Sequence, residues 1–148
     1  MTNNKKYSYY ERKIKYYETD MMQVVHHSNY ARYLEETRID MLNYYGIPFD
    51  MFDEMGYVIP VLDLKCRFIE SLKYGETVKI VPKLYKMTPI KFYFSYKIYD
   101  ESMTVVKHEA ETSHCILNKE FKPVSLKKNE PEIYKKMLAM LDEGDKND

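Results

Sequence analysis

Hydrophobic and polar positions change their repeat along this chain, and each change marks a different kind of element. From Ser28 onward, apolar residues recur every three or four positions, which predicts a helix that ends before Gly46 and Pro48. The apolar stripe of this helix consists of Tyr30, Tyr33, Leu34, Thr37, Met41 and Tyr44. Ser28 or Asn29 can cap its first turn, because a short polar side chain there accepts a backbone hydrogen bond.

Beyond residue 56 the repeat becomes two, which predicts strands with one apolar face. Turn signals separate four such stretches, which lie within residues 58–68, 78–84, 92–98 and 106–116. An earlier tyrosine-rich stretch, residues 7–17, predicts a first strand, and residues 131–142 predict a short C-terminal helix.

The resulting order predicts an α+β fold, in which one antiparallel five-stranded sheet carries the long helix on one face. No repeat or linker interrupts this order, so residues 1–148 are expected to form a single domain with its core within about 8–126. One helix covers only part of such a sheet and leaves strand edges open. We therefore expect a homo-oligomer, either a dimer or a homotetramer.

Composition narrows the function classes. Basic and acidic residues balance at 23 each, so no long-range field favours nucleic acid or an anionic membrane as partner. No apolar run of about 18 residues is present to span a membrane, and no signal peptide is expected. Cys66 and Cys115 lie in strand-like stretches without metal-type spacing, which indicates reduced, buried thiols and a cytoplasmic location.

The residues that suit chemistry gather just before the long helix. Within residues 16–30 lie the Asp20 carboxylate, the imidazoles of His26 and His27, and several phenols. An acid, a hydrogen-bond partner and a helix N-terminus are the parts needed to attack and polarise a carbonyl. His108 and His114 share a strand face without a carboxylate between them, so packing is favoured over metal binding, and no cofactor is expected.

Several runs of residues carry a family resemblance. They are Tyr16-x-Glu18-Thr19-Asp20, Val24-Val25-His26-His27-x-Asn29-Tyr30, Glu36-x-Arg38, Arg67-Phe68, Tyr74-Gly75-Glu76 and Ala110-x-Thr112-x-His114. They resemble the hotdog-fold acyl-CoA thioesterases, within these the 4-hydroxybenzoyl-CoA thioesterase-like group, which includes the Tol-Pal-associated acyl-CoA thioesterases. The resemblance covers roughly residues 8–126 and implies a five-stranded antiparallel sheet wrapped around one long helix.

The resemblance also implies roles for particular residues. Asp20 falls on the catalytic aspartate, acting as general base for water or as nucleophile through a mixed anhydride. Tyr16 falls on a tyrosine that orients the aspartate, although it can equally be core on the first strand, with Tyr17 as the substitute if the register shifts by one. His27 falls on a histidine that orients the carbonyl or the water, and His26 is expected to face the other way and to be structural. The substrate would lie at a dimer interface, where the helix N-terminus offers N–H groups to the thioester carbonyl.

Two departures from the family concern substrate binding. Gln23 stands where the family has a glycine, so either the loop is rebuilt or the Gln23 side chain enters the pocket. We assign Gln23, Val25 and Asn29 to substrate binding on this loop and helix start. The basic cluster that binds nucleotide phosphates in the 4-hydroxybenzoyl-CoA enzyme is reduced here to Lys86 and Lys91.

The favoured function is therefore hydrolysis of an acyl-CoA thioester to a free acid and CoA. One alternative is an acyl-ACP thioesterase, which keeps the chemistry and changes the carrier. Another is a non-catalytic domain that binds acyl-CoA; the presence of Asp20 and His27 argues against it, and Gln23 argues for it. A hydratase or dehydratase would need its acid and base in a different motif.

Overall fold

A computed structural model describes residues 5–142 of the chain. The expected single domain spans residues 1–148, so its two ends, residues 1–4 and 143–148, lie outside the described residues.

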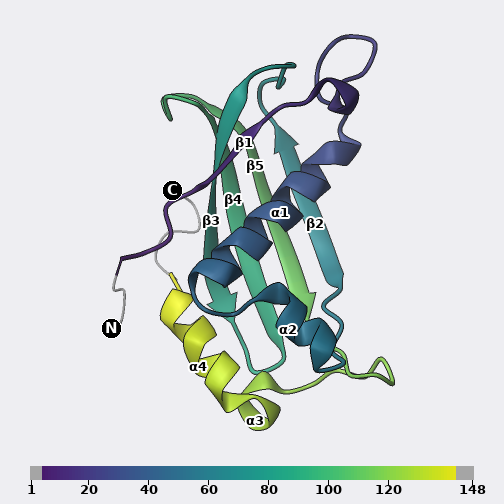
Figure 1. The fold of residues 1–148 in the computed structure, drawn as a ribbon, viewed down its shortest axis with the longest axis vertical. Coiled ribbons are helices and arrows are strands. Elements are labelled where there is room, and N and C mark those ends of the chain that lie inside the picture. Colours follow the sequence, from purple (N-terminus) through teal and green to yellow (C-terminus); the bar gives the residue numbers. More distant parts are fainter. Residues whose placement is uncertain (1–4, 143–148) are drawn as a thin grey trace.

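A five-stranded antiparallel sheet wraps around one long helix (Figure 1). The strands are β1 Tyr10–Lys13, β2 Val61–Phe68, β3 Thr77–Met87, β4 Lys91–Asp100 and β5 Val106–Cys115, in the order β1-β3-β4-β5-β2. The helices are α1 Ser28–Tyr44, α2 Phe49–Glu54, α3 Leu126–Asn129 and α4 Pro131–Met140, and a 3-10 turn, η1, covers Tyr16–Glu18. The predicted α+β class, the long helix and the C-terminal helix are confirmed.

Helix α1 packs most of its predicted stripe against the inner face of the sheet, but Tyr44, the last residue of that stripe, is 40% exposed near the end of the helix. Tyr33 and Leu34 are fully buried there, against Phe94 and Ile98 of β4, which belong to the same core. The helix ends as expected, because Gly46 takes a φ of +80°, a left-handed conformation that costs glycine little.

The prediction of a first strand over residues 7–17 was wrong in its extent. Only Tyr10–Lys13 pairs with β3, and the chain then turns through η1, where Tyr16 and Tyr17 are more than 70% exposed. Alternating tyrosines imitate a strand, but Glu18 accepts a hydrogen bond from the backbone N of Lys15 and closes a turn instead. Helix α2 was missed, because Pro48 was taken only as the stop of α1 although proline also suits a helix start.

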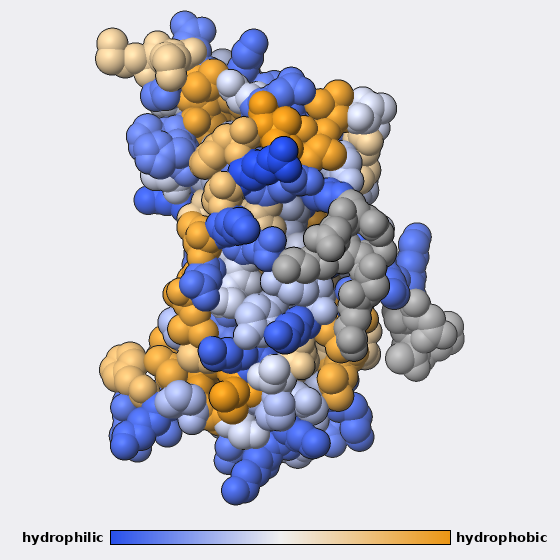
Figure 2. Space-filling view, turned by 180° about the vertical axis from the view of Figure 1, so that it is seen from behind, coloured by the Kyte–Doolittle hydropathy of each residue, from blue (hydrophilic) through white to orange (hydrophobic). Residues whose placement is uncertain are grey.

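The inner face of strand β2 is only partly covered by α1, where Phe68 meets Tyr30 edge-on with ring centroids 5.0 Å apart. Leu64 and Phe68 pair in register with Thr112 and His108 of β5, whose side chains point into the core, yet they are 49% and 55% exposed. Exposed apolar residues follow this margin of the molecule, whereas the back of the sheet is largely hydrophilic in its middle (Figure 2). The same exposure leaves Cys66 only half-buried, against the expectation for both thiols, while Cys115 is buried.

Two histidines lie inside the core, as their expected packing role requires. His108 is fully buried and stacks on Tyr30 with ring centroids 4.3 Å apart, and neither of its ring nitrogens has a hydrogen-bond partner within residues 5–142. His114 lies 2.8 Å through Nε2 from the Thr112 hydroxyl. Burial lowers the pKa of His108 to about 4, and burial, with the nearby Arg38 charge, lowers that of His114 to about 3.

Across the described residues, no group of three histidine, cysteine, aspartate or glutamate side chains is placed to hold a metal ion. Nor is any helix of residues 5–142 long and apolar enough to cross a membrane.

Candidate active site

Asp20 lies in a tight loop that opens immediately before α1. An isolated bridge between Thr19 and Val25 closes the loop, and the backbone N of Asp20 donates to the carbonyl of Val24 at 2.9 Å. Oδ1 of Asp20 accepts a hydrogen bond from the backbone N of Met22 at 2.8 Å, while Oδ2 has no hydrogen-bond partner within residues 5–142. A half-buried carboxylate with one fixed and one unengaged oxygen can take a proton from water or attack a carbonyl.

Gln23, at the position where the family resemblance leads one to expect glycine, has a left-handed backbone conformation. It takes a φ of +66°, and its backbone N donates to the carbonyl of Asp20 at 2.9 Å. The loop therefore has a left-handed residue at this position although it is not glycine, and the Gln23 side chain is exposed. A residue with a Cβ is strained in this conformation by about 1–2 kcal/mol.

Replacing Gln23 with glycine is expected to raise the free energy of unfolding by several tenths of a kcal/mol to about 1 kcal/mol, because released strain exceeds the added flexibility of the unfolded chain. Urea denaturation measures the change. Gln23→Ala is the matched control, since it removes the same side-chain polar group but keeps the Cβ. Equal stability of the glycine and alanine variants would contradict the strain.

The start of α1 carries a free donor at His27. His27 occupies the N-cap position without a side-chain cap, and its backbone N–H donates to no acceptor in the described part of the chain. The expected caps were wrong: the Ser28 backbone N–H donates to His26 Nδ1 at 3.2 Å, and Asn29 Nδ2 donates to the Glu18 carbonyl at 2.9 Å. His26 thus has a structural contact, but the prediction that it faces away from His27 was wrong, because the two rings stack with centroids 4.2 Å apart.

Two other predicted site residues lie elsewhere around the loop. Tyr16 is 73% exposed, and its ring meets the edge of Tyr74 at 5.6 Å between centroids, so the core alternative was wrong. Its hydroxyl makes no hydrogen bond to Asp20. Val25 is 6% exposed and donates its backbone N–H to the carbonyl of Leu72 at 2.8 Å, so it anchors the loop to the core.

Glu18 is the residue that the sequence reasoning passed over. It is 4% exposed, and Arg12 Nη2 lies 2.6 Å from its Oε2. An acidic residue inside a motif next to the candidate catalytic aspartate was the available signal.

Lys86 and Lys91 are not brought to Asp20 within one chain. Strand β3 starts near the Asp20 loop, where Val24 bridges Lys73, and ends at Met87 beside both lysines. Ten residue steps of a strand span about 33 Å. Lys86 instead lies over the ring of Tyr93 at 5.1 Å.

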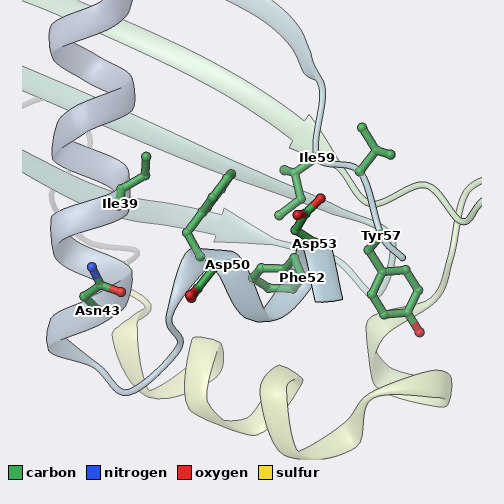
Figure 3. Close-up of a pocket in the computed structure, with 9 residues that line it drawn as sticks. Ile39, Asn43, Asp50, Phe52, Asp53, Tyr57 and Ile59 are labelled. Atoms are coloured by element: carbon green, nitrogen blue, oxygen red, sulfur yellow. The ribbon is translucent and has the colours of Figure 1, made fainter. Parts of the chain in front are cut away.

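A cleft of about 710 Å³ opens at the other end of α1 (Figure 3). Its lining is Ile39, Asn43, Phe49, Asp50, Phe52, Asp53, Tyr57, Val58 and Ile59, which is apolar inside with amide and carboxylate groups among the walls. Along α1, Ile39 and Asn43 of the cleft wall lie eleven and fifteen residue steps from Ser28, or about 17 and 23 Å at 1.5 Å per step. The cleft and the Asp20 loop are therefore separate places within one chain.

Comparison with known proteins adds to this geometry. Residues 14–137 match the family described as the Thioesterase-like superfamily. A protein of Aquifex aeolicus described as "Putative esterase" is 36% identical over 126 residues, 85% of this chain and 96% of the relative. A Bacillus subtilis relative, "Putative acyl-CoA thioesterase YneP", is 29% identical, over 82% of this chain and 88% of its own. The solved DHNA-CoA thioesterase of Staphylococcus aureus matches with a TM-score of 0.83 at 29% identity, covering 89% of this chain and 91% of that one.

Proposed function

The chain belongs to the thioesterase-like superfamily and is a thioester hydrolase with the hotdog fold, and on this basis we propose that it cleaves acyl-CoA thioesters with the Asp20 carboxylate. One observation carries the assignment: within residues 5–142, Asp20 Oδ2 accepts no hydrogen bond, and the helix that follows its loop starts with a His27 N–H that has no acceptor.

In the proposed reaction, the Asp20 carboxylate acts on the water and the His27 N–H acts on the thioester oxygen. Asp20 Oδ2 takes a proton from water as the water oxygen adds to the thioester carbonyl, and the His27 N–H with the positive end of α1 stabilises the oxyanion. Collapse of the tetrahedral intermediate breaks the C–S bond, and the CoA thiolate takes the proton back from the Asp20 carboxylic acid. Direct attack by Asp20 through a mixed anhydride, which water then hydrolyses, gives the same products.

Substrate contacts complete this proposal. In this proposal the exposed side chains of His27 and Gln23 orient the thioester or the water, and the exposed Tyr16 ring beside the loop borders the substrate. Asn29 and Val25 act from behind by holding the loop and the helix start.

Two copies are proposed as the smallest active unit. Antiparallel pairing of two β2 edges across a two-fold axis would cover the exposed face of β2 and would run the two α1 helices in opposite directions. The N-terminus of α1 in one copy would then lie at the same end of the dimer as three features of the other copy, namely its cleft, Lys86 and Lys91. The apolar cleft would hold the acyl group, and the lysines would meet CoA phosphates.

A charge on the β2 edge tests this assembly. Leu64→Lys would bury an ammonium in the proposed interface, so we expect monomers whose turnover per chain falls about tenfold or more. Light scattering with size-exclusion chromatography gives the molar mass and so distinguishes monomer, dimer and tetramer. A thiol-release assay gives the rate of thioester hydrolysis. Leu138→Lys, on an exposed apolar residue of α4, is the matched control. An active monomer would exclude a shared site.

The function itself is tested with a panel of short, medium, long and aryl acyl-CoAs, each compared with the same acyl group on acyl carrier protein. Release of CoA with kcat/KM well above that for the carrier protein supports the proposal. Preference for the carrier would establish the acyl-ACP alternative. Binding without turnover on any substrate would overturn hydrolysis in favour of a binding domain.

A further inference from the structure

Glu18 is a carboxylate in a buried position two residues before Asp20. Its Oε1 accepts hydrogen bonds from Arg12 Nη1 at 2.7 Å, the backbone N of Lys15 at 2.9 Å and the Tyr33 hydroxyl at 3.0 Å. Burial by itself raises the pKa of Glu18, but these bonds, that of Arg12 foremost, hold it below its ordinary value. A buried carboxylate is tolerated only when its oxygens are engaged in this way.

Arg12 extends this cluster to three elements. It lies on β1, its Nε donates to Glu36 Oε1 on α1 at 2.7 Å, and its guanidinium lies 4.4 Å from the centroid of the Tyr33 ring. Glu18 itself ends η1. The cluster of Arg12, Glu18, Tyr33 and Glu36 therefore fixes β1, η1 and α1 relative to one another.

The backbone of Glu18 fixes the far end of the Asp20 loop. Its carbonyl accepts hydrogen bonds from the backbone N of His26 and from Asn29 Nδ2, both at 2.9 Å. Residue 18 thus joins the start of the loop to the start of α1. The Thr19–Val25 bridge begins at the next residue of the chain. Asp20 and His27 lie at the two ends of this loop, which is held at its base by the Glu18 carbonyl.

From these contacts we propose that Glu18 is a positioning residue, which holds the Asp20 carboxylate and the His27 N–H in register for the reaction. The kinetic part of this inference rests on the proposed function, whereas the anchoring of the loop does not. A buried arginine–glutamate pair is a weak source of stability compared with apolar side chains of similar size, but its directional bonds define geometry. Displacing a reacting group by about 1 Å can cost a hundredfold in rate.

Hydrogen exchange of Glu18→Gln tests the anchor without any substrate. The variant keeps the side-chain size and removes the charge that Arg12 pairs with, so we expect the amides of Asp20, Val25 and His26 to exchange about tenfold faster or more, with those of β4 and β5 unchanged. Tyr7→Phe, which removes the hydrogen bond to Asp40 away from this loop, is the control and should leave loop exchange unchanged. Unchanged loop exchange in Glu18→Gln would overturn the proposal, whatever the activity.

Kinetics tests whether the anchor serves the chemistry. We expect Glu18→Gln to lower kcat about tenfold to a hundredfold with KM within about threefold of wild type, and Glu18→Asp, which keeps the charge, to recover part of the loss. In an Asp20→Asn background the Glu18 substitution should cost nothing further, because both act through one group. Faster loop exchange with an unchanged kcat would overturn the positioning role. A wild type inactive on every thioester would refute the proposed function and leave the exchange result to decide the anchor.

Discussion

Asp20→Asn is expected to lower kcat/KM for acyl-CoA hydrolysis about a hundredfold or more, with little change in stability. The amide keeps the shape of the carboxylate and can still accept the Met22 hydrogen bond on its oxygen. It can neither take the proton of water nor form an anhydride. Thiol release measured across substrate concentrations separates this loss in kcat from any change in KM.

The matched control is Glu101→Gln, which neutralises an exposed carboxylate in the turn between β4 and β5. It should retain full turnover. If Asp20→Asn retains it as well, the acid–base assignment fails although the protein is a thioesterase. The reacting carboxylate would then have to be sought elsewhere.

Acidification is expected to destabilise the fold between pH 6.5 and about 4. An unfolded chain protonates His108 near pH 6.5, whereas the folded chain keeps it neutral until pH falls to about 4, so the unfolded state binds more protons in this window. Stability from the neutral ring is complete above pH 6.5 and is lost as pH falls toward 4. The shift corresponds to about 3 kcal/mol for His108, and His114, with a pKa of about 3, adds to it.

Urea unfolding at pH 7, 6 and 5 measures this slope, and His108→Phe should flatten it by about one proton. Phenylalanine fits the aromatic surroundings of Tyr30 and Phe68 and removes the unpaired ring nitrogens. Phe68→Leu is the control, since it disturbs the same cluster without removing a titrating group. A His108→Phe slope equal to that of wild type would place the acid sensitivity elsewhere.

The periodic parts of this fold could be predicted from the sequence, because their burial depends on the chain itself. The stripe from Tyr30 to Met41 and the alternating faces of β3, β4 and β5 have the buried pattern expected. Strand β2 has the same alternation, but its residues are largely exposed, because α1 covers little of this strand in the described part of the chain. Pattern reveals that a face is apolar, not what packs on it.

The residues of the candidate site could be predicted from the sequence, but their arrangement in space was predicted less well. Asp20 and His27 do flank one loop, but the role of the helix cap passed to His26, and Tyr16 lies on the surface. Cap choice and left-handed backbone at Gln23 depend on hydrogen bonds between residues several positions apart. Spacing along a sequence does not encode such bonds. Glu18 was visible inside the motif, but its burial and its pairing with Arg12 could not be read from spacing.

The open edge of β2 also has a consequence for newly synthesised chains. A newly made copy presents unpaired backbone beside Leu62, Leu64 and Phe68, which is a template for any extended peptide that arrives first. Asp63, Lys65 and Arg67 alternate with these residues and discourage stacking of identical strands. Until this edge is paired, aggregation of newly made chains is expected to begin here, and more readily at high protein concentration.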